Sequence, residues 1–170
     1  MTRVLLADDH ALVRSGLAAL LGGAEQIEVV GEAADGQQAY ELASSLRPDV
    51  VLMDLSMPVL DGVAATRRIA ADVPGAHVVV LTSFADRRRV TEAMAAGAVG
   101  YLVKDCDPYD IIAAVRSAPT GWAPVDPRVA DALRSRGATR DAAPARARRA
   151  GRWRGLRRGL PVPQGGVGQA

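Results

Sequence analysis

Short β-branched apolar runs alternate along the first 117 residues with segments whose apolar positions recur at helical spacing. The second run alternates apolar and polar residues over Ile27–Val29, which predicts a half-exposed strand at a sheet edge. The third and fourth runs are continuously apolar, as strands covered on both faces are. Together the runs predict five strands, at Val4–Ala7, Ile27–Gly31, Val50–Met53, Val78–Leu81 and Gly100–Val103.

Helical patterns fill the intervals between these strands. Apolar residues at Leu12/Val13, Gly16/Leu17 and Leu20 predict one helix face, and Val90, Ala93/Met94 and Gly97 predict another. Helix starts are marked by Asp35, by Asp61 and by Asp107 followed by Pro108. We therefore expect an α/β domain of five strands and five helices, with a parallel sheet, that ends near Ser117.

The remainder of the chain falls into two segments. A connector rich in Pro and Gly covers residues 119–124, and a short helix is predicted over Asp126–Leu133. Of the 37 residues at 134–170, 27 are Arg, Ala, Gly or Pro. Such a composition buries too little apolar surface to offset chain ordering, so it predicts a disordered tail. The expected organisation is a domain at 1–118, a linker at 119–133 and a tail at 134–170.

The formal charge of +2 hides a strong asymmetry. Residues 134–170 hold ten Arg and one acid, Asp141, which is a net +9 and leaves −7 for residues 1–133. This distribution indicates an acidic body with a basic tail, and it argues against nucleic-acid binding by the body. The single cysteine, Cys106, excludes an internal disulfide framework and suits a reducing compartment. Because no signal-peptide core and no run of about 18 apolar residues is present, we expect a cytoplasmic protein without a membrane span.

Polar side chains follow four of the predicted strands at the point where each strand ends. They are Asp8 and Asp9, Asp54, Thr82 and Lys104. In a parallel sheet these positions meet at one rim, where ligands of such folds bind. Three carboxylates at one rim repel one another unless a cation lies among them, and an all-oxygen donor set favours Mg²⁺. Lys104 and Thr82 add a positive charge and a hydroxyl suited to an anion.

Four stretches of the sequence resemble a response-regulator receiver domain over residues 1 to about 118. Lys104 followed by Asp105, and the stretch onward to Leu133, resemble the NarL/FixJ (LuxR-type) branch. The resemblance implies a flavodoxin-like (βα)5 doubly wound parallel sheet with strand order 2-1-3-4-5. The matching stretches are Leu5–His10, Met53–Pro58 with Asp61-Gly62, Leu81–Ser83, and Gly100–Asp105.

The resemblance also implies site roles. Asp54 matches the phosphoacceptor, which takes a phosphoryl group from a sensor histidine kinase. Asp9 and Asp54, with the backbone carbonyl of Ser56, match the Mg²⁺ ligands, and Asp8 matches the acid that completes the pocket through water. Lys104 would neutralise charge on the transferring group.

A switch is implied as well. Thr82 would move its hydroxyl onto the new phosphoryl oxygen, and Tyr101 would turn inward behind it. The altered surface would then change partner affinity, with a homodimer formed on phosphorylation as one candidate outcome. No helical periodicity continues beyond Leu133, so the DNA-binding output module of that branch is not matched. We hypothesise that a frameshift in GC-rich DNA replaced it.

Two other functions remain open from the sequence. A stand-alone receiver would titrate a kinase or partner without a DNA step. A Mg²⁺-dependent phosphohydrolase is disfavoured, because the first strand lacks an Asp-x-Asp pair and the chain lacks a cap domain; we therefore expect no enzyme beyond slow autodephosphorylation. Taken alone, Asp9 could simply cap the first helix. His10 and His77 are expected to be surface and strand-start residues, and Arg87–Arg89 are expected to form a solvated helix face.

Overall fold

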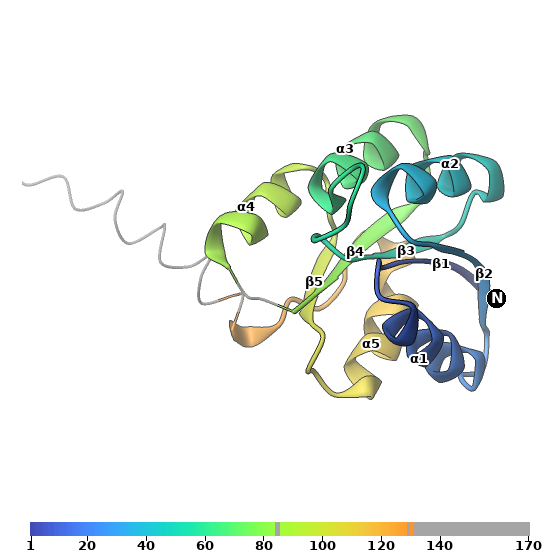
Figure 1. The fold of residues 1–170 in the computed structure, drawn as a ribbon. Helices are drawn as coiled ribbons and strands as arrows, with labels where there is room; N and C mark the ends of the chain where they lie inside the picture. Colours follow the sequence, from blue (N-terminus) through green and yellow to red (C-terminus); the bar gives the residue numbers. More distant parts are fainter. Residues whose placement is uncertain (84–85, 129, 131–170) are drawn as a thin grey trace, which may run out of the picture.

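The computed structural model of the chain describes residues 1–83, 86–128 and 130 (Figure 1). Within them, parallel strands form one sheet in the order β2-β1-β3-β4-β5. The strands are β1 (Thr2–Ala7), β2 (Ile27–Ala33), β3 (Val50–Met53), β4 (His77–Thr82) and β5 (Gly100–Val103). The helices are α1 (Ala11–Gly22), α2 (Gly36–Leu46), α3 (Gly62–Asp72), α4 (Arg87–Ala95) and α5 (Pro108–Ser117), followed by a 3-10 turn, η1 (Ala118–Thr120).

This arrangement confirms the expected flavodoxin-like (βα)5 fold and its strand order. Helices α1 and α5 cover one face of the sheet, and α2, α3 and α4 cover the other (Figure 1). Successive side chains of β1 point to opposite faces, so Leu6 packs with Leu21 of α1 while Leu5 packs with Ile69 of α3. The sheet is therefore enclosed on both sides, and only its rims can carry polar chemistry.

Most local predictions hold, with corrections at Gly97 and Leu12. Gly97 was expected on a helix face with Val90, but α4 ends at Ala95 and Gly97 follows it with a φ of 109°. The predicted capping acids Asp35, Asp61 and Asp107 each accept a backbone N–H of the following helix. The alternating second strand lies at the sheet edge, as expected. Leu12 was expected on the buried face of α1, but its side chain is 86% exposed. The buried face instead runs through Leu17 and Leu21, one turn apart, which turns Leu12 toward solvent.

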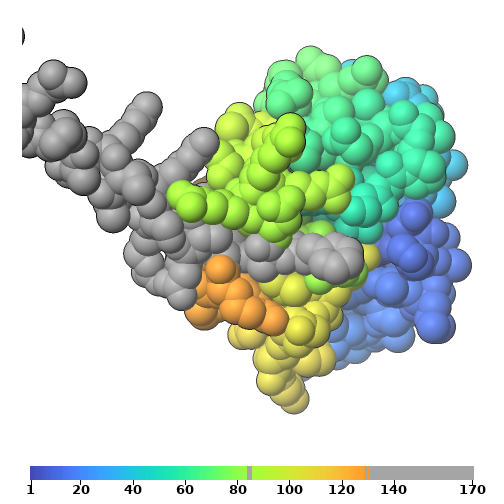
Figure 2. All heavy atoms as spheres, turned by 60° about the vertical axis from the view of Figure 1, so that its left-hand side comes forward, coloured from blue at the N-terminus to red at the C-terminus, as the bar shows by residue number. Residues whose placement is uncertain are grey.

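The linker segment (residues 121–128) lies along the outer edge of β5. Ala123 N–H donates to the Val99 carbonyl at 3.1 Å, Tyr101 N–H to the Pro124 carbonyl at 3.3 Å, and Asp126 N–H to the Tyr101 carbonyl at 2.8 Å. A Cβ at Gly100 would lie 2.5 Å from the Ala123 Cβ, so this close approach depends on glycine. Figure 2 shows the segment in orange at the surface beside the yellow residues that include α5. The linker segment thus satisfies backbone groups that an edge strand otherwise exposes.

Arg128 fastens the end of this segment. Its Nη2 lies 2.8 Å from Asp126 Oδ2 and 2.8 Å from Asp105 Oδ1. Pro127, Arg128 and Ala130 are helical, in agreement with the short helix expected there; Asp126 directly precedes them, and positions 129 and 131–133 lie outside the described part of the chain. The predicted disordered tail at 134–170 lies outside it too. In the described residues, none of the helices has the length and apolar character needed to cross a bilayer.

Candidate functional site

The strand register brings the polar strand ends to one rim of the sheet. Ala7 pairs with Met53 across β1 and β3, and Thr82 pairs with Val103 across β4 and β5. The pairing extends past the strands, because Asp54 N–H donates to the Ala7 carbonyl at 2.8 Å and Lys104 N–H donates to the Thr82 carbonyl at 2.7 Å. Residues far apart in sequence therefore meet at the carboxyl end of the sheet, as the sequence predicted.

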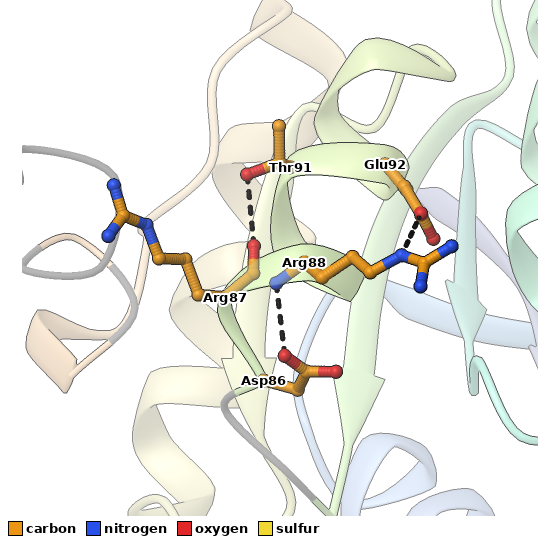
Figure 3. A pocket seen from close by; sticks show the side chains of 5 residues that line it. All are labelled: Asp86, Arg87, Arg88, Thr91 and Glu92. Carbon is orange, nitrogen blue, oxygen red and sulfur yellow. Dashed lines mark hydrogen bonds and ion pairs between the residues drawn. The ribbon is translucent and has the colours of Figure 1, made fainter. Parts of the chain in front are cut away.

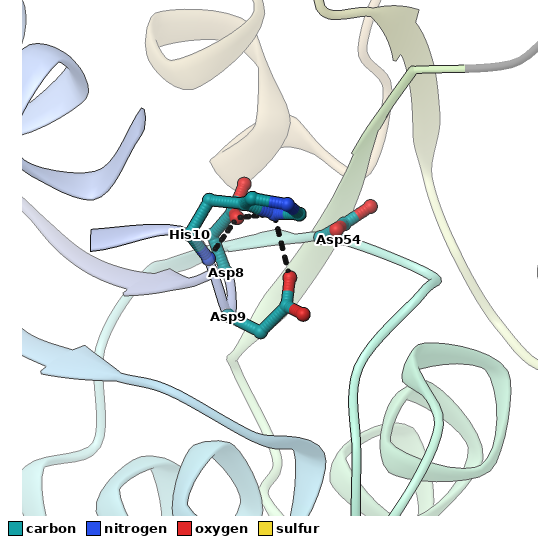
Figure 4. Close-up of side chains that lie close together, drawn as sticks. All are labelled: Asp8, Asp9, His10 and Asp54. Carbon is teal, nitrogen blue, oxygen red and sulfur yellow. Dashed lines mark hydrogen bonds and ion pairs between the residues drawn. The ribbon is translucent and has the colours of Figure 1, made fainter. Parts of the chain in front are cut away.

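An acidic cluster occupies this rim (Figure 4). Asp8, Asp9, His10 and Asp54 each offer a ligand atom, and these atoms lie within 4.8 Å of one another. Asp8 and Asp54 are only 2% and 3% exposed, whereas Asp9 lies at the surface. Two buried carboxylates facing a third one at this separation form a site of concentrated negative charge.

The capping alternative for Asp9 is wrong. The residue at the start of α1 is His10, and no side chain caps that helix. Asp8 instead fixes the turn, because its Oδ1 accepts the His10 N–H at 2.9 Å. Asp9 is left facing the cluster, with its Oδ1 2.8 Å from His10 Nδ1.

His10 belongs to the cluster, although the sequence reading assigned it only to the surface. Its side chain is indeed 67% exposed, but its Nδ1 faces both Asp8 and Asp9. Its position directly after two strand-end aspartates was the available signal. The lack of a second, suitably spaced histidine was the reason to exclude His10 from a site. That criterion does not apply to a histidine that shares a turn with two site aspartates.

Lys104 supplies the opposite charge from the other side of the site. Its Nζ lies 2.6 Å from Asp8 Oδ2 and 3.1 Å from Asp54 Oδ2. Burial alone would lower the pKa of this ammonium, but the hydrogen bonds and charges of Asp8 and Asp54 outweigh that effect and raise the pKa. Lys104 is therefore held in its charged form between two buried carboxylates.

The ionised form of Asp54 is still disfavoured, although Lys104 lies beside it. Burial raises the pKa of its carboxyl and the charge of Asp8 adds to the rise, while Lys104 offsets only part of it. One ammonium for three carboxylates, two of them buried, leaves net negative charge at this rim. The donor set is three carboxylates and one exposed imidazole, with no thiol, and its carboxylate oxygens fit a hard divalent cation such as Mg²⁺.

Glycine packing fixes the backbone that carries Asp54. Gly62, the first residue of α3, donates its N–H to the Leu55 carbonyl at 3.1 Å. A Cβ on Gly62 would lie 2.0 Å from the Asp54 carbonyl oxygen. In the same loop, Val59 has a φ of 66°, a left-handed conformation that is costly for a β-branched residue. The loop that follows Asp54 is thus held by close backbone contacts and tolerates local strain.

Thr82 and Tyr101 lie behind the cluster. Thr82, 2% exposed, ends β4, and Tyr101, fully buried, lies on β5. Burial is the main cause that raises the pKa of the Tyr101 phenol to about 12; the charges of Asp86 and Asp54 add to the rise, whereas the charge of Arg89 and a hydrogen bond with Thr82 oppose it. These residues therefore form one electrostatic neighbourhood.

Ser56 and Arg89 border the same neighbourhood from the outside. The Ser56 side chain is exposed, and its Oγ accepts a hydrogen bond from Arg89 Nη1 at 2.6 Å. The sequence pattern predicts the same solvated helix face for all three arginines, Arg87–Arg89. Only the rotation of α4 relative to the β3–α3 loop distinguishes it, and the sequence carries no signal for that.

Comparison with known proteins points to one family. The profile of the response regulator receiver domain matches residues 4–116, which is more than half of the chain. The transcriptional regulatory protein LiaR of Bacillus subtilis is 45% identical over 136 residues, covering 80% of this chain and 64% of LiaR. The response regulator protein VraR of Staphylococcus aureus is 42% identical over 134 residues, covering 79% of this chain and 64% of VraR. The matched part thus spans just under two thirds of these relatives.

Solved structures give the same result. A two-component response regulator of the LuxR family from Aurantimonas sp. SI85-9A1 is 33% identical with a TM-score of 0.76, covering 81% of this chain and 99% of that one. The receiver domain of the putative response regulator NarL from Mycobacterium tuberculosis is 34% identical with a TM-score of 0.68, covering 71% and 97%. The sheet order, the acidic rim and these matches agree: the chain belongs to the response regulator receiver domain family, and its relatives include LuxR-type regulators of two-component systems.

Proposed function

We propose that this receiver is a phosphoacceptor whose Asp54 takes a phosphoryl group from the phosphohistidine of a sensor histidine kinase. The observation that carries the proposal is the placement of Asp54: it is 3% exposed, at the carboxyl rim of the sheet, with Lys104 Nζ 3.1 Å from its Oδ2. A carboxylate in that position is a nucleophile with a fixed orientation. It is also next to the cation that a phosphoryl group requires.

The reaction exchanges one bond to phosphorus for another. A carboxylate oxygen of Asp54 attacks phosphorus, the bond from phosphorus to the histidine nitrogen breaks, and the imidazole leaves with that electron pair. Lys104 neutralises charge on the phosphoryl oxygens, while the backbone contact with Gly62 keeps the Asp54 loop in place. The chain's contribution is positioning and electrostatics.

The acidic cluster is also suited to Mg²⁺. We assign its ligands to Asp9, Asp54 and the backbone carbonyl of Ser56, with Asp8 acting through water. When bound, the ion neutralises charge on the attacking carboxylate and on the phosphoryl oxygens. The fit rests on the oxygen donors of the cluster, whose ligand atoms lie within 4.8 Å of one another, and on the net negative charge left after Lys104 is counted.

Thr82 and Tyr101 are the proposed switch. Phosphorylation adds about −1.5 to −2 charges and three acceptor oxygens beside Asp54. Thr82 turns its hydroxyl to one of these oxygens and gives up its hydrogen bond with Tyr101. Tyr101 already lies inside the domain in this structure, and its backbone N–H and carbonyl both bind the linker segment. Through these backbone hydrogen bonds, the loss of the contact between Tyr101 and Thr82 would affect the chain that follows the receiver.

In the whole protein this switch would regulate transcription, as the name of the relative LiaR indicates for that protein. A homodimer formed on phosphorylation is the proposed route, and the cytoplasm is the proposed location. No described residue is assigned to DNA binding. A stand-alone receiver that titrates a kinase is the alternative, and translating the coding DNA in its other frames separates the two.

Phosphorylation by a small donor tests the proposal. The protein is incubated with acetyl phosphate and Mg²⁺, and intact mass is measured for the wild type and for Asp54→Ala. We expect one added phosphoryl group on the wild type and none on the variant or after chelation of the metal. A mass gain that persists in Asp54→Ala would remove Asp54 from its role. Repeated turnover of phosphomonoesters would instead favour the phosphohydrolase.

A further inference from the structure

Three consecutive arginines open α4, and the structure gives them different surroundings. Arg88 Nε pairs with Glu92 Oε1 at 2.8 Å, and its side chain is 84% exposed. The Arg87 guanidinium points away from that pair (Figure 3). Arg89 is half-buried, and its Nη1 donates to Ser56 Oγ at 2.6 Å. One arginine of the three therefore reaches the loop that carries Asp54.

The charge of Arg89 acts inside the site. Ser56, its partner, lies two residues after Asp54 in the chain. The Tyr101 phenol responds to both charges, because Asp54 raises its pKa and Arg89 lowers it, although burial has the largest effect. Arg89 and Asp54 thus lie close enough to the same buried hydroxyl to influence it in opposite directions.

Most hydrogen-bond donors of the Arg89 guanidinium have no partner among the described residues. Among the described residues it forms no ion pair, and the hydrogen bond to Ser56 Oγ uses one of its five N–H groups. Its side chain lines a hollow of about 270 Å³ between α3 and α4, so it is not packed on every side. A flexible guanidinium with unused donors, beside a site short of positive charge, is suited to an incoming anion.

We propose that Arg89 is a second cation for the phosphoryl group on Asp54, in addition to Lys104. The inference rests on the proposed phosphoacceptor function. A phosphoryl group beside Asp8 and Asp9 brings more negative charge than Lys104 and a bound Mg²⁺ together would balance, and Lys104 is already shared between Asp8 and Asp54. Arg89 approaches from α4, exchanges the neutral Ser56 hydroxyl for a phosphoryl oxygen, and so ties α4 to the phosphorylated state.

A structural role is the competing explanation. In that case Arg89 only clamps the β3–α3 loop by its hydrogen bond to Ser56. Two substitutions separate the roles: Arg89→Lys keeps the charge, whereas Arg89→Gln keeps a hydrogen-bond donor without charge. Arg87→Gln is the matched control, because it removes one positive charge from the same helix turn, away from the site.

The probe is beryllium fluoride with Mg²⁺, which presents a tetrahedral anionic group to the aspartate without a covalent phosphoryl transfer. Its affinity is measured by titration calorimetry at low and high salt, and circular dichroism checks the fold of each variant. We expect Arg89→Gln to bind about tenfold more weakly, as the loss of one charge-assisted hydrogen bond implies. Arg89→Lys should retain most of the affinity for beryllium fluoride, and Arg87→Gln should retain all of it. The salt dependence of this affinity should become weaker only in Arg89→Gln.

Two results would overturn the inference. Arg89→Gln that binds like the wild type would show that the charge is not used, and an equal loss in Arg87→Gln would show only a general effect of helix charge. Failure of the proposed function looks different, because then the wild type itself neither binds beryllium fluoride nor is phosphorylated on Asp54, and this inference falls with it.

Discussion

Replacement of Gly62 by alanine tests how tightly the Asp54 loop is held. The new Cβ would lie 2.0 Å from the Asp54 carbonyl oxygen and 2.7 Å from the Leu55 Cα, whereas real Cβ contacts stay above 3.0 Å. The backbone must therefore move by about 1 Å at the residue that we propose accepts the phosphoryl group. Overpacking of this kind costs about 1–3 kcal/mol, and no helix-propensity gain offsets it, because Gly62 is the first residue of α3 rather than an interior one.

Two assays read the two consequences. Urea unfolding should show a loss of about 1–3 kcal/mol in the free energy of unfolding. The rate of phosphorylation by acetyl phosphate should fall far more, by about 10²-fold, because a 1 Å misplacement of a reacting group has an effect of that size. The loss of rate is thus expected to exceed what the loss of folded protein explains.

Gly16→Ala is the matched control. Gly16 lies in α1, and a Cβ there meets nothing within 4 Å. The same substitution should stabilise the protein by about 0.5–1 kcal/mol through helix propensity and leave phosphorylation unchanged. If Gly62→Ala behaved like Gly16→Ala in both assays, the argument that glycine packing positions Asp54 would be refuted.

Three further predictions concern the charge and strain of the site. In metal-free protein Asp54→Asn should melt above the wild type near pH 7, and the gap should widen as pH rises from about 3.8: burial raises the folded-state pKa of Asp54, so stability is lost as this carboxyl ionises. Thermal melts from pH 4 to pH 8 check this, and a constant gap would contradict it. Tyr101→Phe should remove from the ultraviolet titration a phenol that ionises at about 12, and it should reduce the loss of stability above pH 10; an unchanged titration would show that another tyrosine gives that signal. Val59→Gly should raise the free energy of unfolding by about 1 kcal/mol in urea, because glycine adopts a φ of 66° without strain; a destabilised variant would show that the Val59 side chain, 83% exposed, contributes more than its backbone strain costs.

The sequence predicted the core of the site because strand ends in a parallel sheet are governed by simple rules. Five apolar runs located the strands, and the residues after them, such as Asp8, Asp54 and Lys104, had to meet at one rim once the strands were parallel. Helix starts were equally readable, since a capping acid such as Asp61 satisfies backbone N–H groups by local geometry alone.

What sequence reasoning missed depends on rotation and on contacts between distant segments. His10 shares its turn with the aspartates, but only the path of the chain into α1 turns its ring toward them. Arg89 differs from Arg87 and Arg88 because its side chain lies on the side of α4 that faces the β3–α3 loop, where it contacts Ser56. The docking of residues 121–128 on β5 rests on backbone hydrogen bonds, which leave no periodic signature in side-chain pattern.

That docking has a practical consequence for dissecting the chain. A truncation placed directly after α5, near the domain end that the sequence predicts, would remove the partners of the Val99 carbonyl and of both backbone groups of Tyr101. The edge of β5, which carries the proposed switch residue Tyr101, would then expose unpaired N–H and C=O groups that can pair with a strand of another molecule. Chimeric sensors or minimal fragments built from this receiver should therefore retain the chain through residue 130, because self-association of a shorter, unphosphorylated fragment would reflect the newly exposed edge of β5 rather than signalling.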